Sequence, residues 1–171
     1  FLTATKGLAI YDVIGDIHGH ADELVQLLER LGYSEAGGVF RHKSRQAVFC
    51  GDYIDRGPQI RDTIHIVRNM VEHQAAHGVM GNHEFNAIAF HTEVPDKPGN
   101  WYRPHTDRNT RQHQATLDQL CDTELQEALD WFRGLPIALD LGDIRVVHAC
   151  WDSREISRLQ NQLSDQGHCS A

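Results

Sequence analysis

The chain has 171 residues, of which 40% are hydrophobic and 23% charged, and its formal net charge is -8. This length suits one domain, and the acidic balance argues against non-specific nucleic-acid binding, which depends on clustered Lys and Arg. No apolar stretch approaches the ~20 residues of a membrane span, and the first residues lack the pattern of a signal peptide. We therefore expect a cytoplasmic protein without membrane association.

The first half of the chain alternates apolar runs with helical patterns. Residues 8–16 and 46–52 are apolar runs that end in Gly-Asp, and residues 77–84 form a weaker third run. Leucines spaced i, i+3, i+4 and i+7 before Gly32 predict one helix, and apolar residues spaced along 60–71 predict another. Strands that alternate with amphipathic helices predict an α/β domain with a largely parallel sheet.

The second half is less regular. Residues 90–111 lack apolar periodicity and predict a long loop. Apolar residues between positions 117 and 132 predict a single helix that ends at Gly134, and residues 136–149 predict two strands around a Leu-Gly-Asp turn. Residues 151–163 have helical potential.

The long loop and its borders carry aromatic, histidine and arginine side chains whose roles the sequence leaves open. Trp101 and Tyr102 could stack on a nucleobase, grip a peptide or pack the loop down. Three histidines could line a cleft, although surface positions are the better prediction: His91, His105 and His113. Three arginines could contact extra phosphates or be solvated: Arg103, Arg108 and Arg111.

Each apolar run of the first half ends in a short polar motif. The motifs are GDIHG at 15–19, GDYIDRG at 51–57 and GNHE at 81–84, and a later strand ends in VVHA at 146–149. Because the carboxyl ends of parallel strands lie at one edge of a sheet, we expect the side chains that follow them to meet. The cluster of oxygen and nitrogen donors expected there comprises Asp16, His18, Asp52, Asn82 and His148. Five donors without a thiolate suit two divalent metals that share a carboxylate better than one metal.

The three motifs, in this order, closely resemble the signatures of the phosphoprotein-phosphatase (PPP) type of calcineurin-like metallophosphoesterases. The resemblance covers residues 10–150. It implies a β-sandwich of largely parallel or mixed sheets flanked by helices, with the active site at the carboxyl ends of the strands. It also implies two divalent metal ions, with manganese favoured and iron or zinc as alternatives.

The resemblance assigns a role to each motif residue. Asp16 and His18 would hold one metal, Asp52 would bridge both, and Asn82 with His148 would hold the second. A metal-bridging hydroxide would attack the phosphorus directly.

The remaining motif residues would act on the substrate. Arg56 would bind the phosphate together with Asn82 and His83, and His83, oriented by Asp55, would protonate the leaving oxygen. A planar guanidinium matches phosphate, and a histidine beside a carboxylate suits a general acid.

We therefore predict a dinuclear metal-dependent phosphoester hydrolase that resembles serine/threonine protein phosphatases. A symmetrical dinucleoside-tetraphosphatase or a nucleic-acid-end phosphatase is the alternative, so the expected partner is a phosphorylated protein or a nucleotide. The sequence gives no indication of oligomeric state.

The family places another metal-ligand histidine beyond the position of His148, where this sequence offers only His168. We expect residues 1–171 to form a single domain that lacks its C-terminal part. A phosphate-binding module impaired by a missing ligand is the alternative from another class.

Overall fold

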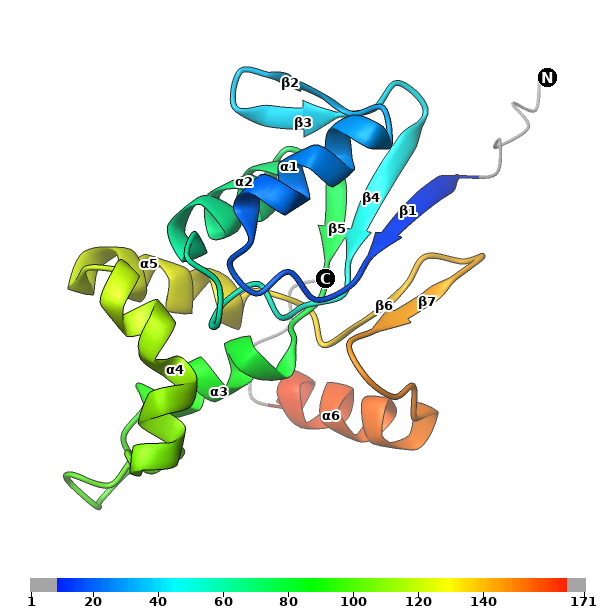
Figure 1. The fold of residues 1–171 in the computed structure, drawn as a ribbon. Coiled ribbons are helices and arrows are strands. Elements are labelled where there is room, and N and C mark those ends of the chain that lie inside the picture. The colour runs from blue at the N-terminus through cyan, green and yellow to red at the C-terminus, as the bar shows by residue number, and fades with distance from the viewer. Residues whose placement is uncertain (1–8, 166–171) are drawn as a thin grey trace.

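The computed structural model describes residues 9–165, which contain a parallel sheet with helices packed against it (Figure 1). The sheet consists of β1 (Ile10–Ile14), β4 (Arg45–Phe49) and β5 (Ala76–Gly78) in the order β1-β4-β5. Both strand pairs are parallel, and the last residues of the three strands are aligned in the register. The three carboxyl ends therefore open at one edge of the sheet, as the sequence predicts.

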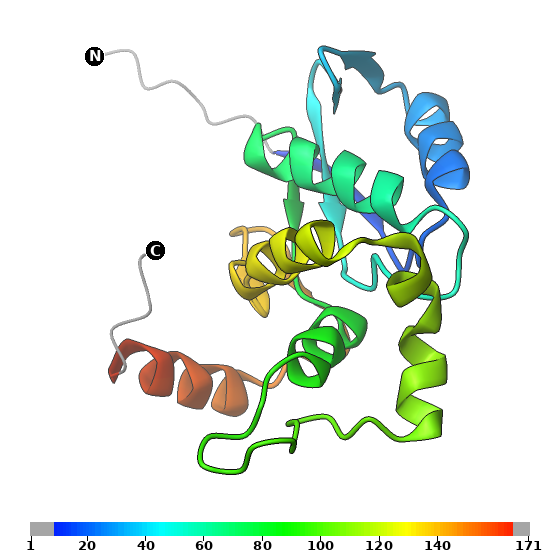
Figure 2. The same ribbon diagram turned by 90° about the vertical axis from the view of Figure 1, so that its left-hand side faces the viewer.

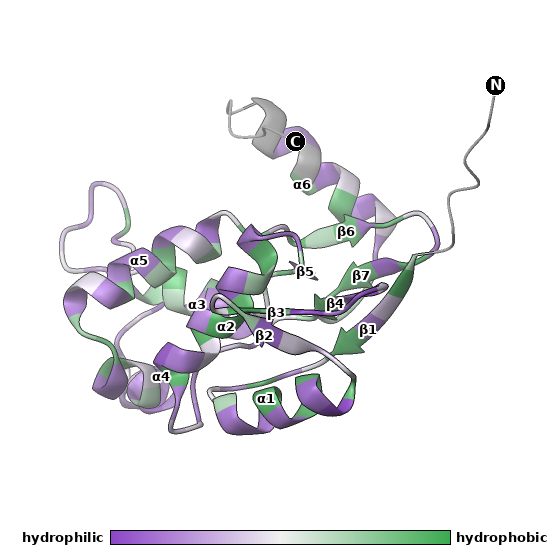
Figure 3. Ribbon diagram, turned by 90° about the horizontal axis from the view of Figure 1, so that it is seen from above, coloured by the Kyte–Doolittle hydropathy of each residue, from purple (hydrophilic) through white to green (hydrophobic). Residues whose placement is uncertain are grey.

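One face of the sheet is covered by α1 (Ala21–Arg30), α2 (Ile60–Glu72) and α5 (Asp122–Arg133), which share a single apolar core with β4. Figure 3 shows how hydrophobic residues alternate with hydrophilic ones along α1. Leu28 and Phe49 are fully buried in this core. Each such side chain contributes roughly 1.5–3 kcal/mol through burial, so this face anchors the loops that follow the strands.

The opposite face of the sheet carries a second, smaller core beneath the antiparallel pair β6 (Ala138–Asp140) and β7 (Arg145–Val147). Val48 of β4 and Val146 of β7 are buried in this core, because successive residues of a strand point to opposite faces. The β6–β7 pair therefore forms the second layer of the expected sandwich, and the two strands predicted within 136–149 are confirmed.

Two short strands were not predicted from the sequence. β2 (Ser34–Ala36) and β3 (Val39–Arg41) form an antiparallel hairpin around Gly37 and Gly38, both of which have positive φ angles (62° and 80°). A Gly-Gly pair is a hairpin signal, but strands of three residues give no measurable alternation.

The helices of the second half differ from the prediction. The third apolar run yields only the short β5, and α3 (Asn82–Phe90) begins inside the GNHE motif. The single helix expected up to Gly134 is two helices, α4 (Asp107–Gln119) and α5. The break occurs where Glu124 accepts a hydrogen bond from the backbone N–H of Cys121, a capping arrangement that starts a new helix.

The segment between α3 and α4 is an ordered loop rather than an open one, and Figure 2 shows it extending away from the sheet. The ring of His105 stacks on Phe90 and on Trp101, with centroid distances of 3.9 Å and 4.6 Å. Of the alternatives for Trp101, packing of the loop is therefore the one observed.

The described chain ends in α6 (Ser153–Asp165), where the sequence indicates helical potential. Among residues 9–165, no helix is both long and apolar enough to cross a bilayer. Cys50, Cys121 and Cys150 are free thiols, whereas Cys169 and His168 lie outside the described residues.

Candidate active site

The five side chains expected to bind metal lie together at the carboxyl edge of the sheet. Asp16 and His18 follow β1, Asp52 follows β4, Asn82 begins α3 and His148 follows β7. Asp52 lies at the centre of the group and is 3% exposed. The loops that carry these residues come from segments far apart in the chain, so only the folded topology creates the cluster.

The distances around Asp52 leave room for cations between the donors. His18 Nε2 lies 3.7 Å from Asp52 Oδ2 and 3.8 Å from Asp16 Oδ2. On the other side, His148 Nε2 lies 3.5 Å from Asp52 Oδ1 and 2.9 Å from Asn82 Oδ1. The two oxygens of one carboxylate thus face different histidines.

The two histidines are held with Nε2 pointing at the cluster. His18 Nδ1 lies 2.8 Å from the carbonyl oxygen of Ile54, and His148 Nδ1 lies 2.8 Å from that of Cys50. An Nδ1–H group that donates to a carbonyl leaves the Nε2 lone pair available for a cation. His18 Nε2 is buried and has no hydrogen-bond partner among the described residues.

The local backbone is strained at the residues that make the site. His18, Asp52, Asp55 and Arg56 all have positive φ angles, of 49°, 57°, 67° and 63°. Such a conformation costs a non-glycine residue on the order of 1–2 kcal/mol, so the surrounding structure must enforce it. The backbone N–H of His18 donates to the carbonyl of Asp52 (2.9 Å), which ties the β1 and β4 loops together.

Glu84 is the main support of the Asp52 loop. It is fully buried and accepts hydrogen bonds from the backbone N–H groups of Asp52 (2.8 Å), Tyr53 (2.8 Å) and Gly81 (2.9 Å). Burial is the largest influence on Glu84 and raises its pKa, while the three N–H groups favour the carboxylate. A Cβ at Gly81 would collide with both the backbone nitrogen and the carboxylate of Asp52, so only glycine permits this approach.

His83 lies beside the metal-ligand candidates, and its ring is within hydrogen-bond distance of Asp55. His83 Nδ1 is 2.6 Å from Asp55 Oδ2, and its Nε2 lies 3.9 Å from Asp52 Oδ2. The hydrogen bond with Asp55 raises the pKa of His83 above its ordinary value, against the opposing effects of burial and of the nearby Arg56 charge. The hydrogen bond with Asp55 therefore favours the protonated ring.

Asp55 is itself held by partners that the sequence did not reveal. Its Oδ1 accepts a hydrogen bond from the Thr116 hydroxyl (2.6 Å) and lies 3.0 Å from His113 Nδ1. Burial opposes ionisation of Asp55, but the hydrogen bonds from His113, His83 and Thr116 together outweigh it and keep the pKa well below its usual range. His113 is 4% exposed, so the prediction of a surface position for it is wrong.

His91 extends this network by one step. Its Nε2 lies 3.2 Å from His113 Nε2, and burial, together with the charge of His113, lowers the pKa of His91 to about 4. A neutral His91 that donates from its Nε2–H to the Nε2 lone pair of His113 leaves the Nδ1–H of His113 to donate to Asp55. Arg56, by contrast, has an exposed side chain, and its charge acts on His83.

The donor atoms fit divalent cations. Two sets have all their ligand atoms within 4.8 Å of one another: His18, Asp52 and His83 in one, and Asp16, Asp52 and His148 in the other. Asp52 belongs to both, and the unpartnered Nε2 of His18 is a polar atom that a cation would satisfy. Oxygen and imidazole donors without thiolate suit manganese, iron or zinc.

A family model described as calcineurin-like phosphoesterase matches residues 11–166. The chain belongs to the calcineurin-like phosphoesterase family. The resemblance drawn from the three motifs is thereby confirmed, and with it the metallophosphoesterase fold. Divalent metal ions are the cofactors that membership of this family implies, and the donors around Asp52 are where this phosphoesterase would hold them.

Its curated relatives include bacterial proteins named bis(5'-nucleosyl)-tetraphosphatase PrpE [asymmetrical]. The relative from Oceanobacillus iheyensis is 30% identical over 141 residues, which cover 81% of this chain and 54% of that protein. The relative from Bacillus subtilis is 45% identical over 74 residues, or 43% of this chain and 30% of that protein. The chain thus spans about half the length of the first of these and less of the second.

Solved structures of low sequence identity share the fold. A cold-active protein-tyrosine phosphatase of a psychrophilic Shewanella species superposes with a TM-score of 0.60 at 21% identity, covering 94% of this chain and 50% of that one. A metallophosphoesterase from Sphaerobacter thermophilus superposes with a TM-score of 0.51 at 22% identity, covering 79% of this chain and 44% of that one. At these identities the likeness supports the α/β fold alone.

Proposed function

We propose that this phosphoesterase hydrolyses phosphoric esters or anhydrides with two divalent cations. Asp16 and His18 would hold the first cation, Asn82 and His148 the second, and Asp52 both. The observation that carries the proposal is that the two oxygens of Asp52 face His18 and His148 from opposite sides. When bound, such cations supply a hydroxide nucleophile near neutral pH and neutralise charge on the phosphoryl group.

The chain's own residues would do the rest. Arg56 has an exposed side chain and would bind the phosphoryl oxygens through its planar guanidinium. His83, held by Asp55 at 2.6 Å, would give the proton on its Nε2 to the leaving oxygen. A positioned general acid of this kind contributes typically ~10²–10⁴-fold to a rate.

A nucleotide polyphosphate is the substrate class that we favour. The support is the name of the relative that aligns over 81% of the chain, which specifies asymmetrical cleavage, whereas the alternative expected from the sequence is symmetrical cleavage. A serine/threonine phosphoprotein is the second candidate, favoured by the PPP-type motifs GDYIDRG and GNHE.

A substrate panel in Mn²⁺ would test the proposal. Diadenosine tetraphosphate, a phosphoserine peptide and p-nitrophenyl phosphate are each incubated with the wild-type protein and with Asp52→Asn, and nucleotide products are separated by chromatography. We expect turnover that requires the metal and is lost in Asp52→Asn, with ATP and AMP as the products of asymmetrical cleavage. If no phosphoester is turned over at any metal concentration, the chain is a binding module and the proposal is wrong.

A further inference from the structure

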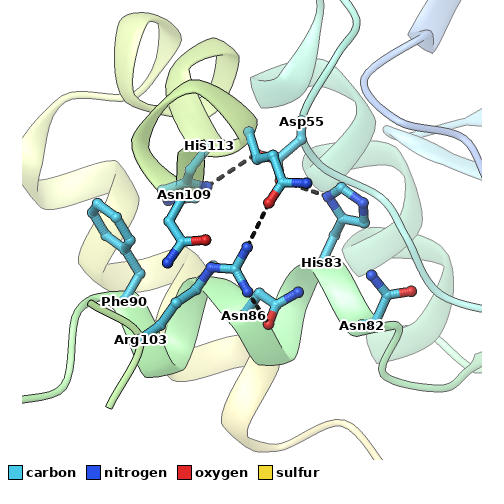
Figure 4. A pocket seen from close by; sticks show the side chains of 10 residues that line it. Asp55, Asn82, His83, Asn86, Phe90, Arg103, Asn109 and His113 are labelled. Atoms are coloured by element: carbon cyan, nitrogen blue, oxygen red, sulfur yellow. Dashed lines mark hydrogen bonds and ion pairs between the residues drawn. The ribbon is translucent and has the colours of Figure 1, made fainter. Parts of the chain in front are cut away.

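A small pocket lies beside His83, between α3 and the start of α4 (Figure 4). It holds about 60 Å³ of free space, and polar groups from both helices line it together with Arg103 of the connecting loop. A buried water needs roughly 10–15 Å³ by this kind of measure, so the pocket has room for only a few small atoms. This is the scale of one phosphoryl group rather than a nucleoside.

Arg103 brings a positive charge that no described carboxylate neutralises. Its Nη1 donates to Asn86 Oδ1 (2.6 Å) and its Nη2 to Gln112 Oε1 (2.7 Å), and Figure 4 shows the side chain reaching toward Asn86. No ion pair of Arg103 occurs within residues 9–165, whereas Arg61 is paired with Glu124 at 2.6 Å. Two neutral amide oxygens orient the guanidinium and leave three of its five N–H groups for another acceptor.

The one carboxylate that lines the pocket is already occupied. Asp55 directs its oxygens at His83, His113 and Thr116, at 2.6–3.0 Å. The carboxylate of Asp55 therefore interacts with these neighbouring side chains and forms no ion pair with Arg103. An anion in the pocket would meet Arg103 and His83, which both line it.

The position of the pocket relative to His83 suggests what the anion is. A general acid contacts the leaving oxygen, so the part of the substrate beyond that oxygen must lie on the His83 side of the scissile bond. His83 and Asn82 form the border between this pocket and the cluster around Asp52. The group next to the leaving oxygen would therefore enter the pocket.

We propose that this pocket is the leaving-group subsite for a substrate with a further phosphoryl group next to the scissile bond, and that Arg103 binds that phosphoryl group. Asn86 and Gln112 are positioning residues, because they act through the guanidinium. The inference rests on the proposed function, since it takes His83 as the acid. It makes Arg103 the residue that distinguishes phosphoanhydrides from simple phosphate monoesters.

The test compares Arg103→Gln with Arg108→Gln, a matched variant on α4 whose arginine is exposed. Gln at position 103 removes the charge and the guanidinium N–H groups and keeps a polar amide. Tripolyphosphate binding to EDTA-treated protein, measured by calorimetry, should weaken ~10-fold or more in Arg103→Gln, as expected for loss of a charge-assisted contact. Arg108→Gln should match the wild type within about twofold, and Arg103→Lys should recover much of the affinity.

Kinetics provide the second measurement. For diadenosine tetraphosphate, kcat/KM should fall ~10-fold or more in Arg103→Gln, because the lost contact lies on the leaving group. For p-nitrophenyl phosphate, which has no second phosphoryl group, kcat/KM of Arg103→Gln should stay within about threefold of the wild-type value.

The two measurements separate the inference from the proposed function. Unchanged tripolyphosphate binding in Arg103→Gln, or equal losses on both substrates, would overturn the subsite. Absence of any turnover by the wild type would overturn the proposed function, while the calorimetry would still decide whether Arg103 binds phosphate. If Arg103→Gln does not fold, Arg103→Met compared with Arg108→Met gives the same test, because Met also removes the charge and keeps an unbranched side chain.

Discussion

Replacement of Glu84 by Gln tests whether this buried carboxylate holds the site together. Glu84 Oε2 accepts from the N–H groups of Asp52 and Gly81, and Oε1 accepts from that of Tyr53. Gln has almost the same shape, but one of its two terminal atoms is an NH₂ group. In the best orientation its single oxygen serves Asp52 and Gly81, and the N–H of Tyr53 then faces another donor.

The cost follows from this count. One buried N–H loses its acceptor, and two hydrogen bonds change from charged to neutral acceptors. A buried unsatisfied donor costs about 1–3 kcal/mol, and we expect Glu84→Gln to lower the free energy of unfolding by about 2–3 kcal/mol. This is a large part of the ~5–15 kcal/mol that stabilises a typical domain.

Urea denaturation followed by circular dichroism measures the change. The control is Glu127→Gln, an exposed glutamate on α5 that should change the free energy of unfolding by less than about 0.5 kcal/mol. Mn²⁺ affinity should fall in Glu84→Gln and not in the control, since the Asp52 loop loses its support. The role assigned to Glu84 would be refuted if Glu84→Gln lowered the free energy of unfolding by less than about 0.5 kcal/mol while the slope of that free energy against urea concentration stayed unchanged.

Three further outcomes are expected. His83→Asn should lower kcat by ~10²-fold or more while the Mn²⁺ content measured by mass spectrometry stays unchanged, and loss of metal would instead make His83 a ligand. Asp55→Asn removes the hydrogen bond that raises the pKa of His83, so the pH at which kcat falls on the alkaline side should move lower; an unmoved profile would contradict the acid role. Mn²⁺ added to EDTA-treated protein should raise its melting temperature, by the equivalent of about 2.7 kcal/mol per site at a hundredfold excess over Kd, and Asp52→Asn should abolish most of this gain.

The part of the fold that positions the site was predictable because its signals are local. The apolar runs that become β1 and β4 each end in Gly-Asp, and parallel pairing then places both loops at one edge. The hairpin around Gly37 was missed because its strands are three residues long. The start of α3 was missed because GNHE follows an apolar run, although Glu84 three residues after Gly81 is a helix-capping pattern.

The environment of the candidate acid was less predictable. Asp55 and His83 belong to recognisable motifs, whereas His113 reaches Asp55 from 58 residues further along the chain. Nothing in the sequence around His113 distinguishes it from a surface histidine, because its burial depends on how α4 packs. The same holds for Arg103, whose amide partners come from α3 and α4.

The attachment of His148 has a consequence for how the protein opens. Within residues 9–165, β6 and β7 pair only with each other, and their core with the main sheet rests on few buried side chains, among them Val146. Such a unit can detach while the rest of the domain stays folded, so its amide hydrogens should exchange with solvent sooner than those of β4. A cation shared by His148 and Asp52 would fasten the hairpin to the sheet, and loading the site would then slow that exchange selectively.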